Sequence, residues 1–353
     1  MARVHGELSE DTLRLAYGRL HRKGAIIVAW YLASYVFLLL ASGWIAGTLA
    51  CVSFALSMVG VGFNIQHDAN HNAFFRTTGS RFSMPNRIVG LSMHAIGGNS
   101  KRWIDGHVFR HHGSPNVVGK DFDIELAPFA RLAPAQRRHA WHGLQHLYLW
   151  VIYAFTSVSI IIGDIVGTVQ DSITGDRTGK APTFKDYVVL LGSKAVFGAA
   201  VLVIPLLRHP WWIVLLGAIA VLLISGFLLG VVFQLAHAVE EADFDESTVR
   251  SKVRWHEWQV RASVDFCHGR GVVARVFTWY AGGLNFQTEH HLFPQLPHTV
   301  YPHISPIVAE TCAEFGIRYQ VQPTLRAAIR SHYRHVRELG LPVATPVPVA
   351  EAA

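Results

Sequence analysis

Two short segments place histidines at spacings that suit metal binding. His67 and His71 stand four residues apart, and His107 and His111 repeat that spacing with His112 directly behind them. On a helix, side chains four residues apart lie on one face, so each pair can reach one metal or two neighbouring metals. An isolated pair is more often a pair of interfacial histidines bonded to loop carbonyls. Three crowded imidazoles are harder to ascribe to packing, because imidazoles titrate near ~6.5 and repel when protonated, whereas metal binding holds them neutral.

A third segment and a lone histidine extend the pattern. His290 and His291 follow Gln287, and His237 is the first polar ring after the apolar stretch 211–236. A lone histidine in such a place is more often an interfacial anchor, so its inclusion depends on the other seven. Since one metal takes about four to six ligands, eight imidazoles suit two metals with about four each. The pattern therefore predicts a dinuclear centre with nitrogen-rich ligation, compatible with iron, zinc or copper.

The composition indicates that membrane helices position these segments. Hydrophobic residues make up 51% of the 353-residue chain and charged residues only 16%, against about 25% in soluble domains. The net charge of +7 does not indicate nucleic-acid binding, because the basic residues avoid the apolar stretches, as they do in the cytoplasmic loops of membrane proteins. Three cysteines without a paired spacing exclude a thiolate metal site.

We predict an all-α fold, a polytopic membrane helical bundle with about four transmembrane helices. The expected spans are 25–43, 46–66, 187–207 and 211–236. If all the histidines meet, an even number of crossings must separate His112 from His237. Segment 147–169, which contains Asp164, is therefore predicted to be an interfacial or shallowly re-entrant helix. Basic residues before the first span favour a cytoplasmic N-terminus.

Three sequence motifs then resemble a known family. HDANHNA, HVFRHHGSPN and NFQTEHHLFP are similar, in order and spacing, to the three histidine boxes of the membrane fatty acid desaturase family. The likeness runs from about Ala25 to Ile317. The third box opens with Gln287 where many members have His, as in front-end and related bacterial acyl-lipid or acyl-CoA desaturases. At that position an amide oxygen, a water or nothing replaces one ligand.

The resemblance implies a non-haem di-iron centre of two Fe, O2 as co-substrate, and a cytosolic helical cap that carries the site. It also implies the metal-binding and catalytic residues, which are His67, His71, His107, His111, His112, His237, His290 and His291. The chain then divides into a cytosolic N-terminal segment 1–24, a membrane desaturase domain 25–317, and a cytosolic C-terminal segment 318–353 with a disordered tail. Asp68, Asp121, Asp123 and Glu289 are candidate hydrogen-bond partners for the ligating rings.

The expected function is an O2-dependent desaturase, integral to the membrane with its active site facing the cytoplasm, that introduces a double bond into a long-chain fatty acyl substrate. Phe63, Phe227 and Phe233 are candidate contacts for the acyl chain. An external ferredoxin, or cytochrome b5 with its reductase, is expected to supply electrons, because the sequence shows no haem-binding or nucleotide-binding motif. The stretch 131–139, rich in Arg, could receive an acidic partner or anionic lipid headgroups.

Two alternatives stay open at this stage. A fatty acyl or lipid hydroxylase or acetylenase of the same superfamily would use the same boxes. A divalent-metal membrane transporter is a more distant alternative, because it needs polar groups near the bilayer midplane, whereas these spans keep their histidines at one end.

Overall fold

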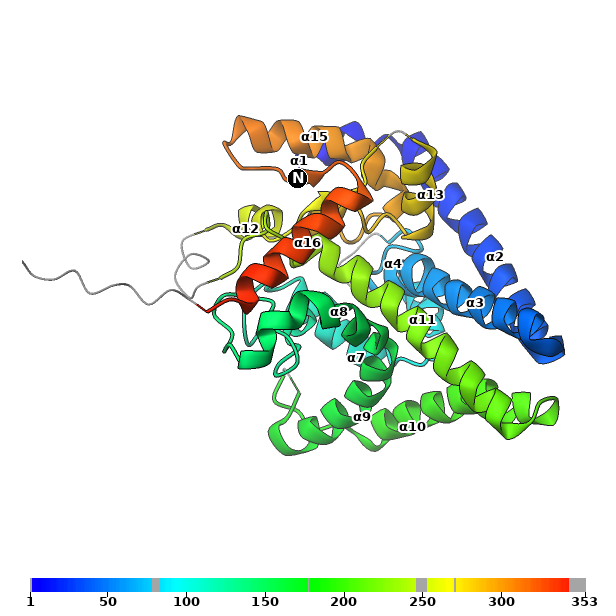
Figure 1. The fold of residues 1–353 in the computed structure, drawn as a ribbon. Coiled ribbons are helices and arrows are strands. Elements are labelled where there is room, and N and C mark those ends of the chain that lie inside the picture. Colours follow the sequence, from blue (N-terminus) through cyan, green and yellow to red (C-terminus); the bar gives the residue numbers. More distant parts are fainter. Residues whose placement is uncertain (1, 78–82, 177, 246–252, 270, 343–353) are drawn as a thin grey trace, which may run out of the picture.

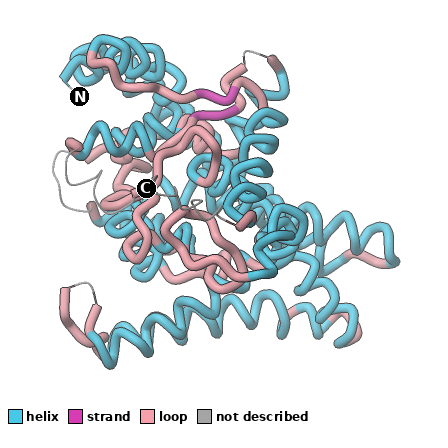
Figure 2. Tube along the Cα trace, turned by 60° about the vertical axis from the view of Figure 1, so that its left-hand side comes forward, coloured by secondary structure: helices cyan, strands magenta, loops and turns pink. Residues whose placement is uncertain are grey.

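Long helices diverge from a cap of shorter ones (Figure 1). The computed structural model describes residues 2–77, 83–176, 178–245, 253–269 and 271–342. Within these residues the only strands are β1 (Asp265–Phe266) and β2 (Val321–Gln322), which pair in parallel (Figure 2). The chain is therefore all-α, as the sequence predicts.

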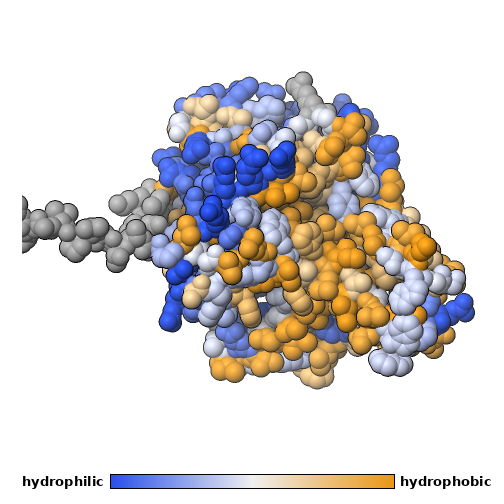
Figure 3. All heavy atoms as spheres, in the orientation of Figure 1, coloured by the Kyte–Doolittle hydropathy of each residue, from blue (hydrophilic) through white to orange (hydrophobic). Residues whose placement is uncertain are grey.

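Four of the described helices are long and apolar enough to cross a membrane. They are α2 (Glu10–Leu40); α3 (Gly43–Val61), continued by η1 (Gly62–Gln66) and α4 (His67–Asn70); α10 (Phe184–Gly198), continued by η5 (Ala199–Val203) and η6 (Pro205–Leu207); and α11 (Trp211–His237). Their outer faces expose large apolar side chains, for example Leu32 at 57% and Leu216 at 53%. Hydrophobic surface spreads over α11 and its neighbours in Figure 3, which fits contact with lipid rather than with water.

The helix that holds the first candidate span begins earlier than the expected span itself. Helix α2 runs unbroken from Glu10, whereas a separate segment is predicted up to residue 24. Ser9 explains the start, because its Oγ accepts a hydrogen bond from the Thr12 amide at 3.1 Å and caps the helix. The change from charged to apolar residues near position 25 therefore lies within one continuous helix. Lys23, just before that change, is only 6% exposed and bonds to His298 Nε2 at 2.8 Å.

The sequence analysis predicts a single helix over segment 147–169, but the structure divides this segment between two helices. Helix α8 (Gln145–Ala154) and helix α9 (Thr156–Thr174) meet at Phe155 with a bend of 70°. The break lies where α11 packs closest, since a Cβ on Gly226 would stand 2.1 Å from the Ala154 carbonyl oxygen. The Thr156 hydroxyl donates to the Tyr153 carbonyl at 2.8 Å and satisfies a group that the bend frees.

Charges within the apolar helices are paired. Asp164 of α9 binds Lys194 of α10 at 2.5 Å, and the same ammonium donates to the Gly97 carbonyl at 2.6 Å. The one acidic residue in 147–169 and the one basic residue in 187–207 are thus a single ion pair. Such pairing lowers the cost of placing either charge in an apolar environment.

The cap is built from short elements contributed by all parts of the chain. In chain order these are α1 (Ala2–Glu7), α5 (Met84–Gly90), α6 (Ser92–Ala95), α7 (Ser100–Trp103), η2 (Ile104–His111), η3 (Phe122–Ile124), η4 (Ala140–Leu144), α12 (Trp255–Arg261), α13 (Val272–Tyr280), α14 (Gln287–Leu292), η8 (His298–Val300), α15 (Tyr301–Glu314) and α16 (Leu325–Gly340). The predicted C-terminal segment holds β2 and α16. The predicted disordered tail lies, from residue 343 onward, outside the described residues.

Candidate metal centre

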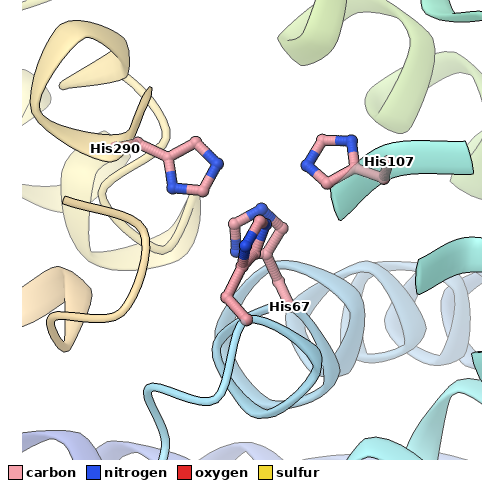
Figure 4. A group of neighbouring side chains, drawn as sticks. His67, His107 and His290 are labelled. Atoms are coloured by element: carbon pink, nitrogen blue, oxygen red, sulfur yellow. The ribbon is translucent and has the colours of Figure 1, made fainter. Parts of the chain in front are cut away.

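Four separate parts of the chain bring eight histidines together. His67 lies in α4 and His71 directly follows it, His107 and His111 lie in η2 with His112 behind them, His237 ends α11, and His290 and His291 lie in α14. All eight are buried, with exposed fractions of 7% or less. Figure 4 shows His67, His107 and His290 directed toward one another from three different elements. The structure thus gathers every histidine that the sequence analysis selects.

A π-helical turn, which sequence spacing alone does not reveal, aligns the second box. The His112 amide donates to the His107 carbonyl at 3.1 Å, so the bond spans five residues instead of four. In an ordinary α-helix, five steps of about 100° would place His112 about 140° around the axis from His107. The wider turn lets His107, His111 and His112 all contact the same cluster of rings. A second π-turn, η1, directly precedes His67; such turns are frequent at functional sites.

The first group comprises His67, His71, His107 and His290. One ring nitrogen from each lies within 4.8 Å of those of the other three. Both nitrogens of His67, and Nε2 of the other three rings, find no hydrogen-bond partner within the part of the chain that the structure describes. Buried ring nitrogens without a partner are costly. A metal ion among these four rings would satisfy them.

The second group comprises His111, His237 and His291. Nε2 of His291 lies 3.2 Å from Nε2 of His111 and 3.2 Å from Nε2 of His237. The opposite nitrogen, Nδ1, of each ring faces an acceptor. Nδ1 of His111 lies 3.0 Å from an Asp121 carboxylate oxygen, and Nδ1 of His237 lies 2.9 Å from the Ala262 carbonyl. Nδ1 of His291 lies 2.7 Å from Gln259 Oε1. In the neutral form of each ring, with its one proton on Nδ1, the Nε2 lone pairs of His111 and His237 both face Nε2 of His291. A cation between them would relieve that repulsion.

His112 connects the two groups. Its ring centroid lies 4.6 Å from those of His71 and His290 in the first group, and it stacks on His291 of the second at 4.2 Å. Neither of its ring nitrogens has a hydrogen-bond partner among the described residues. His112 can therefore bind a metal at either group.

Gln287, the departure from the family's third box, belongs to the second group. Its Nε2 lies 2.9 Å from Nε2 of His237. Since Nδ1 of His237 donates to Ala262, the Gln287 amide donates to the Nε2 lone pair. The glutamine therefore stands where it touches a candidate ligand.

Further acceptors hold the rings of the first group. Nδ1 of His107 lies 3.3 Å from Asp123, and Nδ1 of His290 lies 3.3 Å from the Tyr301 hydroxyl. Such partners fix the tautomer of a ligating imidazole and turn its free nitrogen toward the metal. Gln259 in α12 and Tyr301 in α15 are missed by the sequence analysis, because nothing in their spacing connects them to a histidine box.

Two of the four predicted carboxylate partners face other groups. Asp68 accepts from His298 Nδ1 at 2.8 Å and lies 3.8 Å from His67 Nδ1. Since His298 also contacts the buried Lys23, this network packs behind the first box. Glu289 accepts from the Tyr319 hydroxyl at 2.9 Å. Only Asp121 and Asp123 face candidate ligand rings at hydrogen-bonding distance.

Burial keeps most of these rings neutral. It lowers the pKa of His107 to about 4, and lowers the pKa of His112, His290 and His291 well below the usual value. For His111, burial also lowers the pKa, but the Asp121 and Asp123 carboxylates outweigh it and raise the pKa to about 9. Neutral imidazoles are the form that binds metal, and a carboxylate partner makes the His111 ring a stronger donor to a cation.

We expect Asp121→Asn to weaken metal binding about ten- to a hundredfold. The substitution removes the negative charge at His111 Nδ1 but leaves an oxygen of similar shape. The measurement is competition of the purified protein against a chelator of known affinity. Asp176→Asn, in an exposed loop, is the matched control. Equal metal affinity in the two variants would show that the carboxylate does not support the site.

Known proteins resemble this chain over most of its length. The fatty acid desaturase family model matches residues 42–323. The chain is 34% identical to the sn-1 linoleoyl-lipid 6-desaturase of Arthrospira platensis, over 91% of this chain and 86% of the relative. The enzyme of the same name in Synechocystis sp. is 31% identical over 91% and 88%. The acyl-lipid (8-3)-desaturase of Physcomitrium patens is 34% identical over 90% of this chain and 66% of the relative.

These matches confirm the resemblance that the histidine boxes indicate. Relatives with such names are oxidoreductases that act on fatty acids, and the family implies a fatty acyl or lipid substrate in a membrane. The histidine groups fit a metal site, and four helices fit a membrane location. The chain therefore belongs to the fatty acid desaturase family of membrane enzymes.

Proposed function

We propose that this protein is an O2-dependent desaturase that uses two iron ions to introduce a double bond into a long-chain fatty acyl group carried on a lipid. The observation that carries the proposal is the convergence of buried histidine nitrogens in two groups. The proposed metal-binding residues are His67, His71, His107 and His290 for one iron, and His111, His237 and His291 for the other, with His112 between them. Nitrogen-rich ligation without thiolates is compatible with iron.

The overall reaction balances with an external donor. Two C–H bonds on adjacent carbons are broken and one C=C bond forms. Dioxygen takes up four electrons, two from the acyl chain and two from the donor, and with two protons from solution yields two molecules of water. Iron, when bound, supplies the activation of dioxygen that removal of hydrogen from an unactivated methylene requires.

The protein's own residues orient and isolate the site. Asp121, Asp123, Gln259 and Tyr301 hold imidazoles at Nδ1, so that Nε2 faces inward. Burial of the histidines keeps bulk water away from the reacting carbons. Positioning through such fixed partners lowers the barrier without any contribution from the partners to the chemistry itself.

Aromatic side chains beside the first group are the proposed contacts of the acyl chain. The Phe233 ring of α11 lies 6.3 Å from the His107 ring, and Phe63 of η1 packs on Phe233 at 6.1 Å. Trp103 stacks on His107 at 4.5 Å. The third predicted contact, Phe227, is 39% exposed and lacks such a neighbour among the described aromatic rings, so we assign it to the lipid-facing surface.

Relatives favour a lipid-linked substrate that is already unsaturated. Two of the relatives are named for linoleoyl-lipid, and others are named acyl-lipid desaturases. We therefore propose an acyl-lipid substrate with at least one existing double bond, and a new double bond between it and the carboxyl end. Reduced ferredoxin or cytochrome b5 is the proposed electron donor.

Feeding tests the reaction and the substrate together. A host that expresses the protein with a ferredoxin system receives saturated or polyunsaturated fatty acids, and mass spectrometry locates the product double bonds. We expect one additional double bond on the carboxyl side of an existing one, and a fall to background in His290→Ala, because His290 belongs to the first metal group. His303→Ala, at an exposed histidine of α15, is the control and should retain activity.

Two other product patterns would contradict the proposal. Hydroxylated chains without a new alkene would favour the hydroxylase alternative. New double bonds only in saturated chains would reject the proposed substrate while leaving desaturation itself intact.

We propose that the histidines and both termini face the cytoplasm, because basic residues precede the first span. Ion pairs support placing the end of α9 and the start of α10 on that same side. Arg102 of α7 pairs with Asp171 near the end of α9, and Lys101 binds Asp186 in the first turn of α10 at 2.7 Å. Because η2 with its histidines directly follows α7, these contacts hold the end of α9 and the start of α10 at the histidine side. We propose that the bent pair of α8 and α9 does not cross the membrane.

Cysteine labelling tests this topology. In a Cys51→Ser background, Lys120→Cys and Lys180→Cys flank the bent pair at exposed positions, and Arg208→Cys lies in the turn before α11. We expect a membrane-impermeant thiol reagent added to sealed, right-side-out vesicles to modify only Cys at position 208, with the other two protected until the vesicles are opened. Protection that differs between positions 120 and 180 would mean that α8 and α9 form a fifth span.

A further inference from the structure

Helix α16 packs its inner face against the residues that directly follow a candidate ligand. His332 Nδ1 donates to the Ala238 carbonyl at 2.7 Å, and Ala238 is the residue after His237. Ser331 accepts from the Glu240 amide at 3.0 Å. One hydrogen bond and a short covalent path therefore link the middle of α16 to the second histidine group.

The outer face of α16 is a stripe of arginines. Arg326, Arg330, Arg334 and Arg337 recur every three or four residues, and all are exposed. Of these four arginines, only Arg334 has an ion-pair partner within the described part of the chain: Glu240, at 4.0 Å, with both side chains partly exposed. Hydrophilic surface covers this helix in Figure 3. We call these four residues the arginine face.

The arginine face points away from lipid. Helix α8 lies beneath α16, and two of its buried residues bind it: Gln145 donates to the Val336 carbonyl at 2.6 Å and the Tyr153 hydroxyl lies 2.9 Å from His332. The opposite side of α8 exposes Leu147 at 58% and Val151 at 63%. Since that apolar side suits the membrane interface, α8 separates α16 from lipid and leaves the arginine face toward water.

Two other basic parts of the described cap can be compared for the same two features: a link to a candidate ligand and exposed arginines without close carboxylates. Helix α12 also reaches a ligand, through Gln259 and His291, but its Arg261 is paired with Glu257 at 3.0 Å and Asp243 at 3.7 Å. By sequence, the stretch 131–139 is a candidate site for an acidic partner or for anionic lipid headgroups. Two of its arginines bind within the protein instead: Arg131 donates to the Leu339 carbonyl, and Arg138 donates to the Gly340 carbonyl at the end of α16.

We propose that the arginine face docks an acidic one-electron carrier protein, and that electrons pass by way of His332 and Ala238 to His237. The inference rests on the proposed function, which requires two electrons per double bond. Each docking oxidises the carrier by one electron and delivers that electron to the histidine site, so two dockings complete one turnover. Charge complementarity of this kind raises the rate of association and weakens with salt.

Steady-state kinetics with reduced carrier test the proposal. The enzyme, in nanodiscs of neutral lipid, is assayed against a soluble acidic [2Fe–2S] ferredoxin and, in parallel, against the soluble haem domain of cytochrome b5. We expect Arg330→Glu/Arg334→Glu to raise KM for the effective carrier at least about tenfold at low ionic strength while kcat at saturation is retained. The difference should shrink at about 0.5 M salt. Arg14→Glu/Arg19→Glu on α2 makes the same charge change at exposed positions and should leave KM unchanged.

A small chemical reductant separates docking from catalysis. The enzyme is reduced without oxygen by dithionite and methyl viologen, excess reductant is removed, and O2 is then admitted for a single turnover. In this assay the α16 variant should match the unmodified enzyme, because no protein needs to dock. An unchanged KM for the carrier would overturn the docking assignment and leave the proposed function standing. A defect seen only in nanodiscs with anionic lipid would also overturn it, in favour of a lipid contact. No double-bond formation by the unmodified enzyme with any reductant would reject the proposed function and this inference with it.

Discussion

Eight buried imidazoles can pack this closely as metal ligands, because each ring in its neutral form offers a nitrogen lone pair to a cation. Protonated rings at these spacings would repel one another, and neutral rings without partners would leave buried nitrogens unsatisfied. The second group shows this need for a cation: Nε2 of His291 lies 3.2 Å from Nε2 of both His111 and His237, while Nδ1 of each ring faces an acceptor. The rest of the structure serves to hold these rings in place.

The long helices and their paired charges provide the necessary rigidity. Helices α3 and α11 each deliver histidines at one end, and packing of α11 against α3 and the bent pair brings those ends together. Charged side chains in the apolar helices have partners: Asp164 and Lys194 form an ion pair, and Lys23 contacts His298, whose other ring nitrogen faces the Asp68 carboxylate. The cap then adds the third box and the side chains that orient the rings. Metal binding and membrane packing thus depend on the same few helix ends.

Residue type and spacing predict the eight histidines and the membrane class, because metal ligation leaves a strong local pattern. They do not predict what depends on contacts between distant segments. The π-turn that aligns His112 with His107, the bend at Phe155 against Gly226, and the ring partners Gln259 and Tyr301 all arise this way. Hydropathy also marks a membrane boundary near residue 25 but not the helix start, which the Ser9 cap determines.

The central claim, that the histidines form two metal sites, is tested most directly by anomalous diffraction at the iron absorption edge from crystals of the iron-loaded protein. We expect two iron peaks: one among His67, His71, His107 and His290, and one among His111, His237 and His291, with His112 between them. A single peak within the eight histidines would contradict the account. So would iron only at Asp265, His268 and Glu289, a separate group that could also hold a metal.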